Sequence, residues 1–283
     1  MSAIIQVPEN LVIDREEIFA FRTPFPERNE RRARRWAEIF DVHGEIADLG
    51  QSFVIRDEQG DLEVFHASDS LWWADVPAMN REPDGPVNLP CEEEAIDIAN
   101  TFLQEHELFD DRCRVDTITY ATAGEVVSEH TEPELYRIAM RVNYTFTLDG
   151  LPVMGPGARI GVTIGGDNKV IDLFKFWREP VQDRVFPLLN PEAAARLLQK
   201  DAAFAQLKED EARVIYNRFQ LGYYALPCME WQPFLGPVYQ FSGIAHTPAR
   251  KEIPFSRHVI AISISMEEMK ELGGINQNIS RVF

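Results

Sequence analysis

Residues 136–146 read YRIAMRVNYTF, and this stretch decides the expected fold class. Apolar and polar side chains alternate along it, which is typical of a strand that buries one face. A loop rich in glycine and proline follows at 149–157 (DGLPVMGPG), and a second strand-like segment follows at 158–164 (ARIGVTI). The turn GGDN at 165–168 then leads into a third segment at 170–177. The pattern predicts an antiparallel sheet in the middle of the chain.

Amphipathic helices are expected ahead of each group of strands. Apolar side chains recur at helical spacing from about residue 27 to residue 40. A second helix opens at Cys91, and the three glutamates that follow suit the positive end of the helix dipole. The Asn-Pro pair at 190–191 is typical of an N-cap and a first helical position, so a third helix is expected from there to about residue 207.

Strand-like segments follow each of these helices, so one plan occurs three times. The plan predicts an α+β fold in which repeated modules each pack an amphipathic helix on a small antiparallel sheet. The first expected module is 1–85, which starts with an N-terminal arm, and the second is 86–183. The third is 184–283, which ends in a short helix that starts at Ser265.

The composition indicates a folded, acidic protein. Apolar residues make up 45% of the 283 residues, and the formal net charge is −18. This charge repels phosphate backbones and anionic membranes, so neither nucleic acid nor a membrane is expected as a partner. The three cysteines form no framework, and no apolar run is typical of a signal peptide or a membrane span. A cytoplasmic location is therefore expected.

A pattern of glycine, proline and apolar positions resembles a known family. The segment EEAIDIA at 93–99 leads into strands, DGLPV at 149–153 ends one of them, and IGVTI at 160–164 precedes a Gly-Asp turn. This pattern resembles the tandem PepSY-like modules of the YcdB/YcdC type and the related YycH/YycI proteins. PEAA at 191–194 and PVYQF at 237–241 are similar more weakly. The resemblance implies modules that bind or restrain partner proteins outside the cell, without catalytic residues.

Reactive chemistry is sparse in the sequence. There is no glycine-rich phosphate loop and no Gly-x-Ser-x-Gly nucleophile elbow. His246, Glu252 and His258 would suffice for a metal if they met across a sheet, and ordinary surface or core histidines are the alternative. Cys91 is either a helix cap or a reactive thiol, although the neighbouring glutamates oppose the thiolate. No cofactor and no metal are expected, and enzymatic activity stays open.

The first helix carries a cluster of arginines that allows two interpretations. The cluster is either a dock for a carboxylate or an acidic partner, or a face that pairs with the acidic residues of the chain itself. Its members are Arg28, Arg31, Arg32, Arg34 and Arg35.

Aromatic and arginine side chains in the second and third modules carry the remaining functional signal. Tyrosine, tryptophan and arginine dominate binding hot spots, but they are also ordinary residues of sheets that cover a core. The expected binding residues are Arg141, Tyr144, Trp177, Arg178, Tyr224, Trp231 and Tyr239.

The preferred functional hypothesis is a non-enzymatic, regulatory module that binds a protein or peptide through its sheets. It predicts an exposed apolar face or an open sheet edge. The alternative is an enzyme or small-molecule binder with an aromatic-lined cavity between modules, assisted by Arg141, Arg178 or a histidine. A third hypothesis is a scaffold whose sheets pair into a homo-oligomer.

Overall fold

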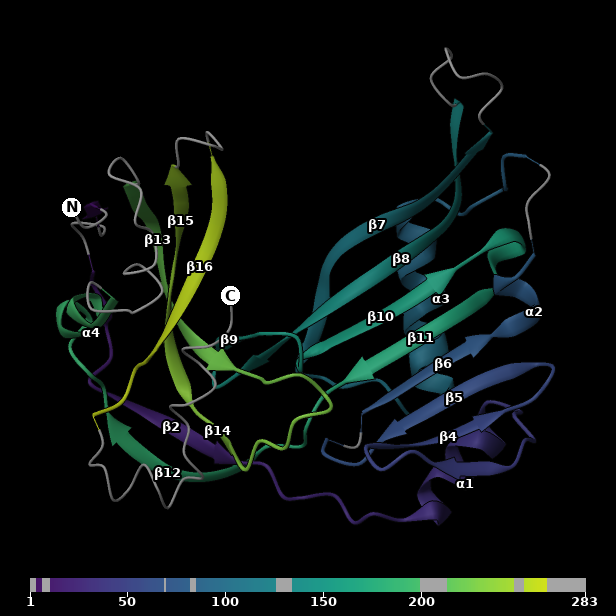
Figure 1. Cartoon of the computed structure of the whole chain (residues 1–283), viewed down its shortest axis with the longest axis horizontal. Helices are drawn as coiled ribbons and strands as arrows, with labels where there is room; N and C mark the ends of the chain where they lie inside the picture. The colour runs from purple at the N-terminus through teal and green to yellow at the C-terminus, as the bar shows by residue number, and fades with distance from the viewer. Residues whose placement is uncertain are drawn as a thin grey trace.

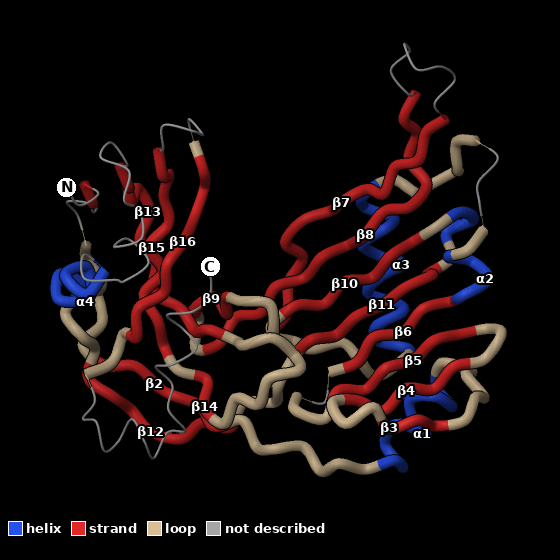
Figure 2. Tube along the Cα trace, in the orientation of Figure 1, coloured by secondary structure: helices blue, strands red, loops and turns tan. Residues whose placement is uncertain are grey.

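The computed structural model describes residues 4–6, 11–68, 70–81, 85–125, 134–198, 213–246 and 252–263. Its helices and strands form two lobes, which lie at opposite sides of the view in Figures 1 and 2. We call them the α3 lobe (residues 30–148 and 159–176) and the α4 lobe (the remaining strands and α4).

In the α3 lobe, the described strands form one antiparallel array. The alternation of apolar and polar residues explains why residues 140–144 form a strand with one buried face. Met140, Val142 and Tyr144 are buried, while Arg141 and Asn143 between them stay partly exposed. The strand order is β7 (Cys113–Glu125), β8 (Glu134–Leu148), β10 (Arg159–Ile164), β11 (Val170–Phe176), β6 (Leu71–Asp75), β5 (Gly60–Phe65), β4 (Ser52–Arg56) and β3 (Ile46–Asp48).

Helices α1 (Glu30–Ile39) and α3 (Glu92–Glu105) cover one face of this array, and the short α2 (Val76–Met79) follows β6. Phe40 follows α1 and stacks on Trp73, with 5.0 Å between ring centroids, and Trp73 lies 6.0 Å from Phe102 of α3. This aromatic cluster fastens both helices to the same side of the sheet. The other side faces the viewer in Figure 1. The buried positions of α3 are Ala95, Ala99 and Leu103, four residues apart.

The α4 lobe combines both ends of the described chain. β13 (Arg213–Tyr224), β15 (Pro237–His246) and β16 (Ile253–Ile260) are antiparallel neighbours, and β1 (Ile4–Gln6) runs parallel to β13. A separate three-stranded sheet has the order β12 (Val181–Pro187), β2 (Glu17–Arg22), β14 (Phe234–Leu235). Helix α4 (Pro191–Leu198) contacts β16.

A short strand joins the two lobes. β9 (Leu151–Met154) pairs antiparallel with β8 and parallel with β13, so Val153 lies opposite both Phe146 and Tyr223. Just after β9, Gly157 lies against the backbone of Leu226, where any Cβ would collide with the Leu226 carbonyl. A glycine is therefore needed at this crossing for steric reasons.

The expected α+β class was wrong. The described chain is mostly β, with four α-helices, and thirteen of its strands belong to one continuous sheet. Repeated modules with separate small sheets do not occur in it, because β6 pairs with β11 (Trp72 opposite Phe174) instead of remaining an edge. An unpaired edge exposes backbone donors and acceptors, and pairing two groups of strands removes two such edges. The interpretation of the chain as a tandem repeat was therefore also wrong.

The local sequence patterns correctly predicted the positions of α1, α3 and the start of α4. α1 lies within 27–40, α3 starts directly after Cys91, and α4 starts at Pro191 with the side chain of Asn190 accepting from the Glu192 amide at 2.9 Å. The expected end of the third helix near residue 207 and the last helix after Ser265 lie outside the described residues. The expected module boundaries at 85/86 and 183/184 stay predictions.

Candidate functional site

The uncovered face of the α3 lobe carries three rows of side chains that run across the strands. The middle row joins Asn143, Gly161, Phe174, Trp72 and Glu63, each directly opposite the next. The row on one side joins Thr119, Arg141, Thr163, Asp172 and Ala74. The row on the other side joins Arg114, Thr145, Arg159 and Phe176.

A buried carboxylate organises the centre of this face. Asp172 has only 3% of its side chain exposed, and it accepts from Arg141 Nη2 at 2.8 Å, Thr163 Oγ1 at 2.8 Å and Trp72 Nε1 at 2.7 Å. Arg141 Nε also donates to Thr163 Oγ1 at 2.8 Å. A buried charge needs such partners, because an unpaired one costs several kcal/mol. Asp172 therefore holds the arginine and the indole in fixed positions.

Aromatic rings lie beside the Arg141 guanidinium. The ring of Phe174 occupies the space above Gly161, where a Cβ would collide with it. Phe176 stacks on Phe174 with 4.8 Å between centroids, and the Arg141 guanidinium lies 5.4 Å from the Phe174 centroid. The result is a rigid, partly exposed aromatic platform with a cation at its border.

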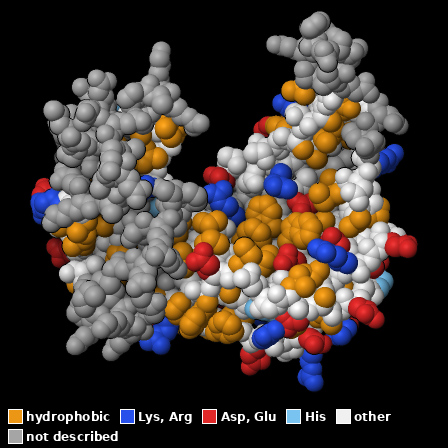
Figure 3. Space-filling model, viewed as in Figure 1, with side chains coloured by type: hydrophobic (Ala, Val, Ile, Leu, Met, Phe, Trp, Pro, Cys, Tyr) orange, Lys and Arg blue, Asp and Glu red, His pale blue; other side chains and the backbone are white. Residues whose placement is uncertain are grey.

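The platform has basic residues on one flank. Arg114 and Arg159 are exposed, and each is a cross-strand neighbour of Thr145, one on β7 and the other on β10. Neither forms an ion pair with a described residue. On the other flank, Glu63 accepts from Ser52 Oγ at 2.6 Å. We call this site the Arg141 surface, and it comprises Trp72, Arg114, Arg141, Arg159, Phe174 and Phe176. Figure 3 shows hydrophobic side chains gathered on this side of the molecule with basic ones among them.

The structure brings only one of the seven expected binding residues to this surface, namely Arg141. Tyr144 lies on the helix side of β8 and donates to Asn100 Oδ1 at 2.9 Å, and burial raises its pKa. Tyr239 donates to the Leu189 carbonyl at 2.7 Å, and burial raises its pKa to about 12. Tyr224 is buried with its ring 4.5 Å from that of His258. These three tyrosines serve packing.

Trp177 and Arg178 fasten the two lobes together. The Trp177 ring stacks on Phe146, with 3.9 Å between centroids. Arg178 donates to the carbonyls of Leu226 at 2.8 Å and Pro227 at 2.7 Å, and to that of Glu230. Burial lowers the pKa of Arg178 to about 10. Trp231 is 55% exposed and contacts Phe25 edge-on, away from the three rows.

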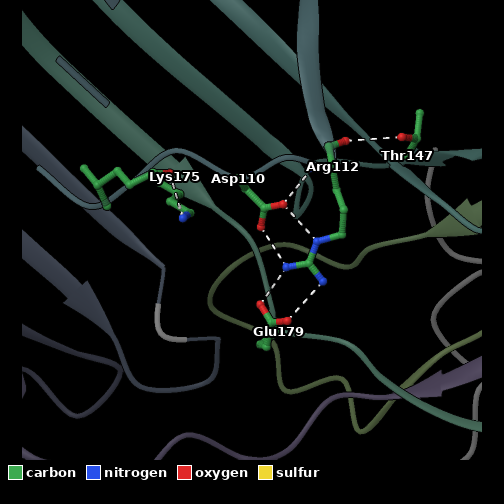
Figure 4. A network of polar contacts seen from close by, with 6 residues as sticks. Asp110, Arg112, Thr147, Lys175 and Glu179 are labelled. Carbon is green, nitrogen blue, oxygen red and sulfur yellow. Dashed lines mark hydrogen bonds and ion pairs between the residues drawn. The ribbon is translucent and has the colours of Figure 1, made fainter. Parts of the chain in front are cut away.

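A second polar network supports the same junction (Figure 4). Arg112 binds Asp110 through Nε and Nη2, at 2.9 and 2.8 Å, and binds both oxygens of Glu179, at 3.0 and 2.8 Å. Lys175 donates to the Leu108 carbonyl at 2.8 Å, and burial lowers its pKa. Burial also raises the pKa of Cys113, which disfavours the nucleophilic thiolate. The contacts pair these charges and attach the segment after β11 to the start of β7.

The described residues contain no group of three or more His, Cys, Asp or Glu side chains arranged to hold a metal ion, and this covers His246, Glu252 and His258. None of the helices in the described ranges is both long enough and apolar enough to cross a bilayer.

The expected binding residues did not include Trp72, Phe174, Phe176 or Asp172, although Phe174 and Phe176 belong to the aromatic group that carried the signal in the second module. The alternation in β8 places Arg141 on the polar side of its strand, and this signal identifies one member of the site. The others require the register of β10, β11 and β6 against β8, which no local pattern contains.

Comparisons with known proteins identify no family. No family model matches the sequence, and no curated protein matches it. One similar solved structure is an uncharacterized protein from Eubacterium rectale ATCC 33656. It is 10% identical with a TM-score of 0.46, and the alignment covers 92% of this chain and 88% of that chain. A similarity at this identity and TM-score supports neither a family nor a function for this chain. The resemblance to PepSY-like modules gains no support from it.

Proposed function

We propose that the chain is a regulatory protein- or peptide-binding module, and that the Arg141 surface takes an acidic segment of a partner that also carries apolar side chains. The observation that supports this proposal best is the composition of the uncovered face. A preorganised arginine lies beside stacked aromatic rings, and the Asp172 network holds it in place. Arginine and aromatic side chains with little freedom left to lose are the usual anchors of binding hot spots.

Charge complementarity supports an acidic occupant. The protein has a net charge of −18, yet this face presents Arg114, Arg141 and Arg159 on three neighbouring strands. Arg141 Nη1 has no acceptor among the described residues, although Nε and Nη2 are both used. A carboxylate on the partner would complete the hydrogen bonding of this guanidinium, and apolar side chains would cover the rings.

A cavity between modules lined by the expected aromatic residues has no comparable support. Tyr144, Trp177, Tyr224 and Tyr239 are each at most 7% exposed and are used in packing. We therefore do not extend the proposal to a small-molecule site there.

The test is selection from a random peptide display library against the full chain, followed by affinity measurement on variants. We expect selected peptides to be enriched in Asp or Glu together with aromatic or aliphatic residues. R114Q/R159Q should weaken their binding about tenfold, or roughly 1.4 kcal/mol, because two charges that face the peptide are lost. Both side chains are exposed and form no ion pair with the described residues, so the variant should fold normally.

Arg218→Gln provides the matched control, since Arg218 is an exposed strand arginine in the α4 lobe. It should bind the selected peptides like the wild type. Peptides without acidic enrichment, or equal affinity for R114Q/R159Q and R218Q, would overturn the proposed function.

A further inference from the structure

We infer that the α3 lobe has a second site, on the helix side of its sheet, that binds a compact, multiply charged oxyanion of the phosphate type. The site is a hollow of about 490 Å³ beside α1, and the described residues that line it are Arg31, Arg32, Arg35 and Trp36. α1 packs on β4 and β5 from the side opposite the Arg141 surface. The inference therefore stands independently of the proposed function.

The lining offers hydrogen-bond donors and, among the described residues, no acidic side chain. Three guanidinium groups contribute forked donors, whose geometry matches two oxygens of a phosphate or a carboxylate. Trp36 also lines the hollow, but its indole Nε1 is shielded from solvent and therefore does not act as a donor to a ligand there. Since guanidinium groups only donate, the chemical complement of this lining is an anion.

The position of these arginines on the helix favours a bound anion. Arg31 and Arg32 lie in the first turn of α1, where the helix dipole favours negative charge. Arg31 and Arg35 are four residues apart, a spacing at which like charges repel. Burial and the charge of Arg35 both lower the pKa of Arg32. A bound oxyanion would offset the repulsion and would also interact favourably with the dipole.

Two further arginines of this region pair with carboxylates away from the hollow. Arg34 pairs with Glu30 at 3.6 Å and Arg28 pairs with Asp48, and neither lines the hollow. Arg35 pairs with Glu107 at 2.6 Å, in an ion pair in which both side chains are more than 60% exposed. An exposed pair of this kind contributes little, so it leaves Arg35 able to reorient toward a ligand.

Net charge and site charge act at different distances. An overall charge of −18 opposes long polyanions such as nucleic acids. A compact anion that fits within a Debye length of three arginines experiences mainly their local field. We therefore expect tripolyphosphate to bind more tightly than citrate, because its greater negative charge is attracted more strongly by the three guanidinium groups.

The experiment uses the full chain with sodium tripolyphosphate as the probe, in buffers matched in ionic strength with sodium chloride. Calorimetric titration should show saturable binding, and thermal unfolding should shift upward with the probe. The indole N–H resonance of Trp36 should move on titration, which is a local readout at the hollow. R31Q/R35Q should lose at least tenfold in affinity, whereas R34Q on the same helix should stay within about twofold of the wild type.

Three results would contradict the inference. The first is absence of binding to the wild type at matched ionic strength. The second is an equal loss of affinity in R34Q and R31Q/R35Q, which would indicate nonspecific attraction to the helix. The third is equal affinity for citrate, which would contradict the assignment to phosphate oxyanions.

Discussion

Arg178 shows that an arginine, a residue type common in binding sites, can instead stabilise the fold from a buried position. The residue is 5% exposed, and its guanidinium donates to three carbonyls of the loop 226–230. A cation that is buried with carbonyl partners is costly to remove, because the carbonyls then lose their donors and no water replaces them. The residue type alone does not reveal this use, since an exposed hot-spot arginine looks the same in a sequence.

Arg178→Met should therefore lower the free energy of unfolding by about 3 kcal/mol or more, because each of the three carbonyls would lose a charged donor. Urea denaturation followed by tryptophan fluorescence measures this change. Arg218→Met, at an exposed position, should change stability by less than about 0.5 kcal/mol. Equal stability of the two variants would show that the Arg178 contacts contribute nothing.

His258 should make stability depend on pH. Burial, with a smaller contribution from the charge of Arg257, lowers the pKa of His258 to about 4. The unfolded chain takes up this proton near pH 6.5, whereas the folded chain takes it up only near pH 4. Stability should therefore fall by up to about 3 kcal/mol as the pH drops from 6.5 to 4. His258→Leu should flatten this part of the stability curve, and an unchanged slope in that variant would rule out His258 as its source.

Helix starts were predictable because their signals are local. The glutamates after Cys91 and the Asn-Pro pair at 190–191 mark the first turns of α3 and α4 within the sequence itself. Arg141 could be assigned to the polar side of β8 for the same reason. Which strands lie side by side was not predictable, because the contacting residues are distant in the sequence. Trp72 Nε1, for example, donates to Asp172, which is 100 positions away. Adjacent Trp72 and Trp73 go to opposite faces, and only the register decides which one enters the core.

The start of α3 offers a test of capping. The Glu94 side chain accepts from the Cys91 amide at 3.1 Å, but the Cys91 thiol is a weak acceptor for the first-turn amides. Cys91→Ser should strengthen the capping box and raise stability by about 0.5–1 kcal/mol, because a hydroxyl accepts better than a thiol. The matched control is Cys113→Ser in half-buried β7, which should bring no gain. A stability of C91S at or below that of the wild type, measured by thermal unfolding, would contradict the capping argument.

Both lobes depend on segments that are distant in the sequence. β2 lies between β12 and β14, so an N-terminal strand completes a sheet whose other strands come from the second half of the chain. This arrangement could not be derived from composition or spacing, since the first 27 residues carry three prolines and look like an extended arm. Ile18, Ala20 and Phe21 are buried within this region.

Ala20→Asp should disrupt the α4 lobe selectively. Ala20 is fully buried opposite Arg184, whose Nε already donates to Asp183 at 3.0 Å, so a desolvated carboxylate at position 20 should cost about 3 kcal/mol or more. Hydrogen exchange should show early loss of protection in β12 and β14, while β8 and β10 stay protected. Ala121→Asp, at an exposed position of β7, should leave both lobes protected. Uniform loss of protection in A20D would show instead that the two lobes unfold as one unit.

The place of β2 also has a consequence for synthesis. On the ribosome, residues 17–22 emerge early, but β14 ends only at Leu235. At about 5–20 residues per second, the apolar side of β2 stays without its full set of strand partners for roughly 10 to 45 seconds, although β12 is made earlier. During that time Ile18 and Phe21 resemble the exposed segments that chaperones recognise. We therefore expect the nascent chain to need a holding chaperone at residues 17–22 until β14 has been made.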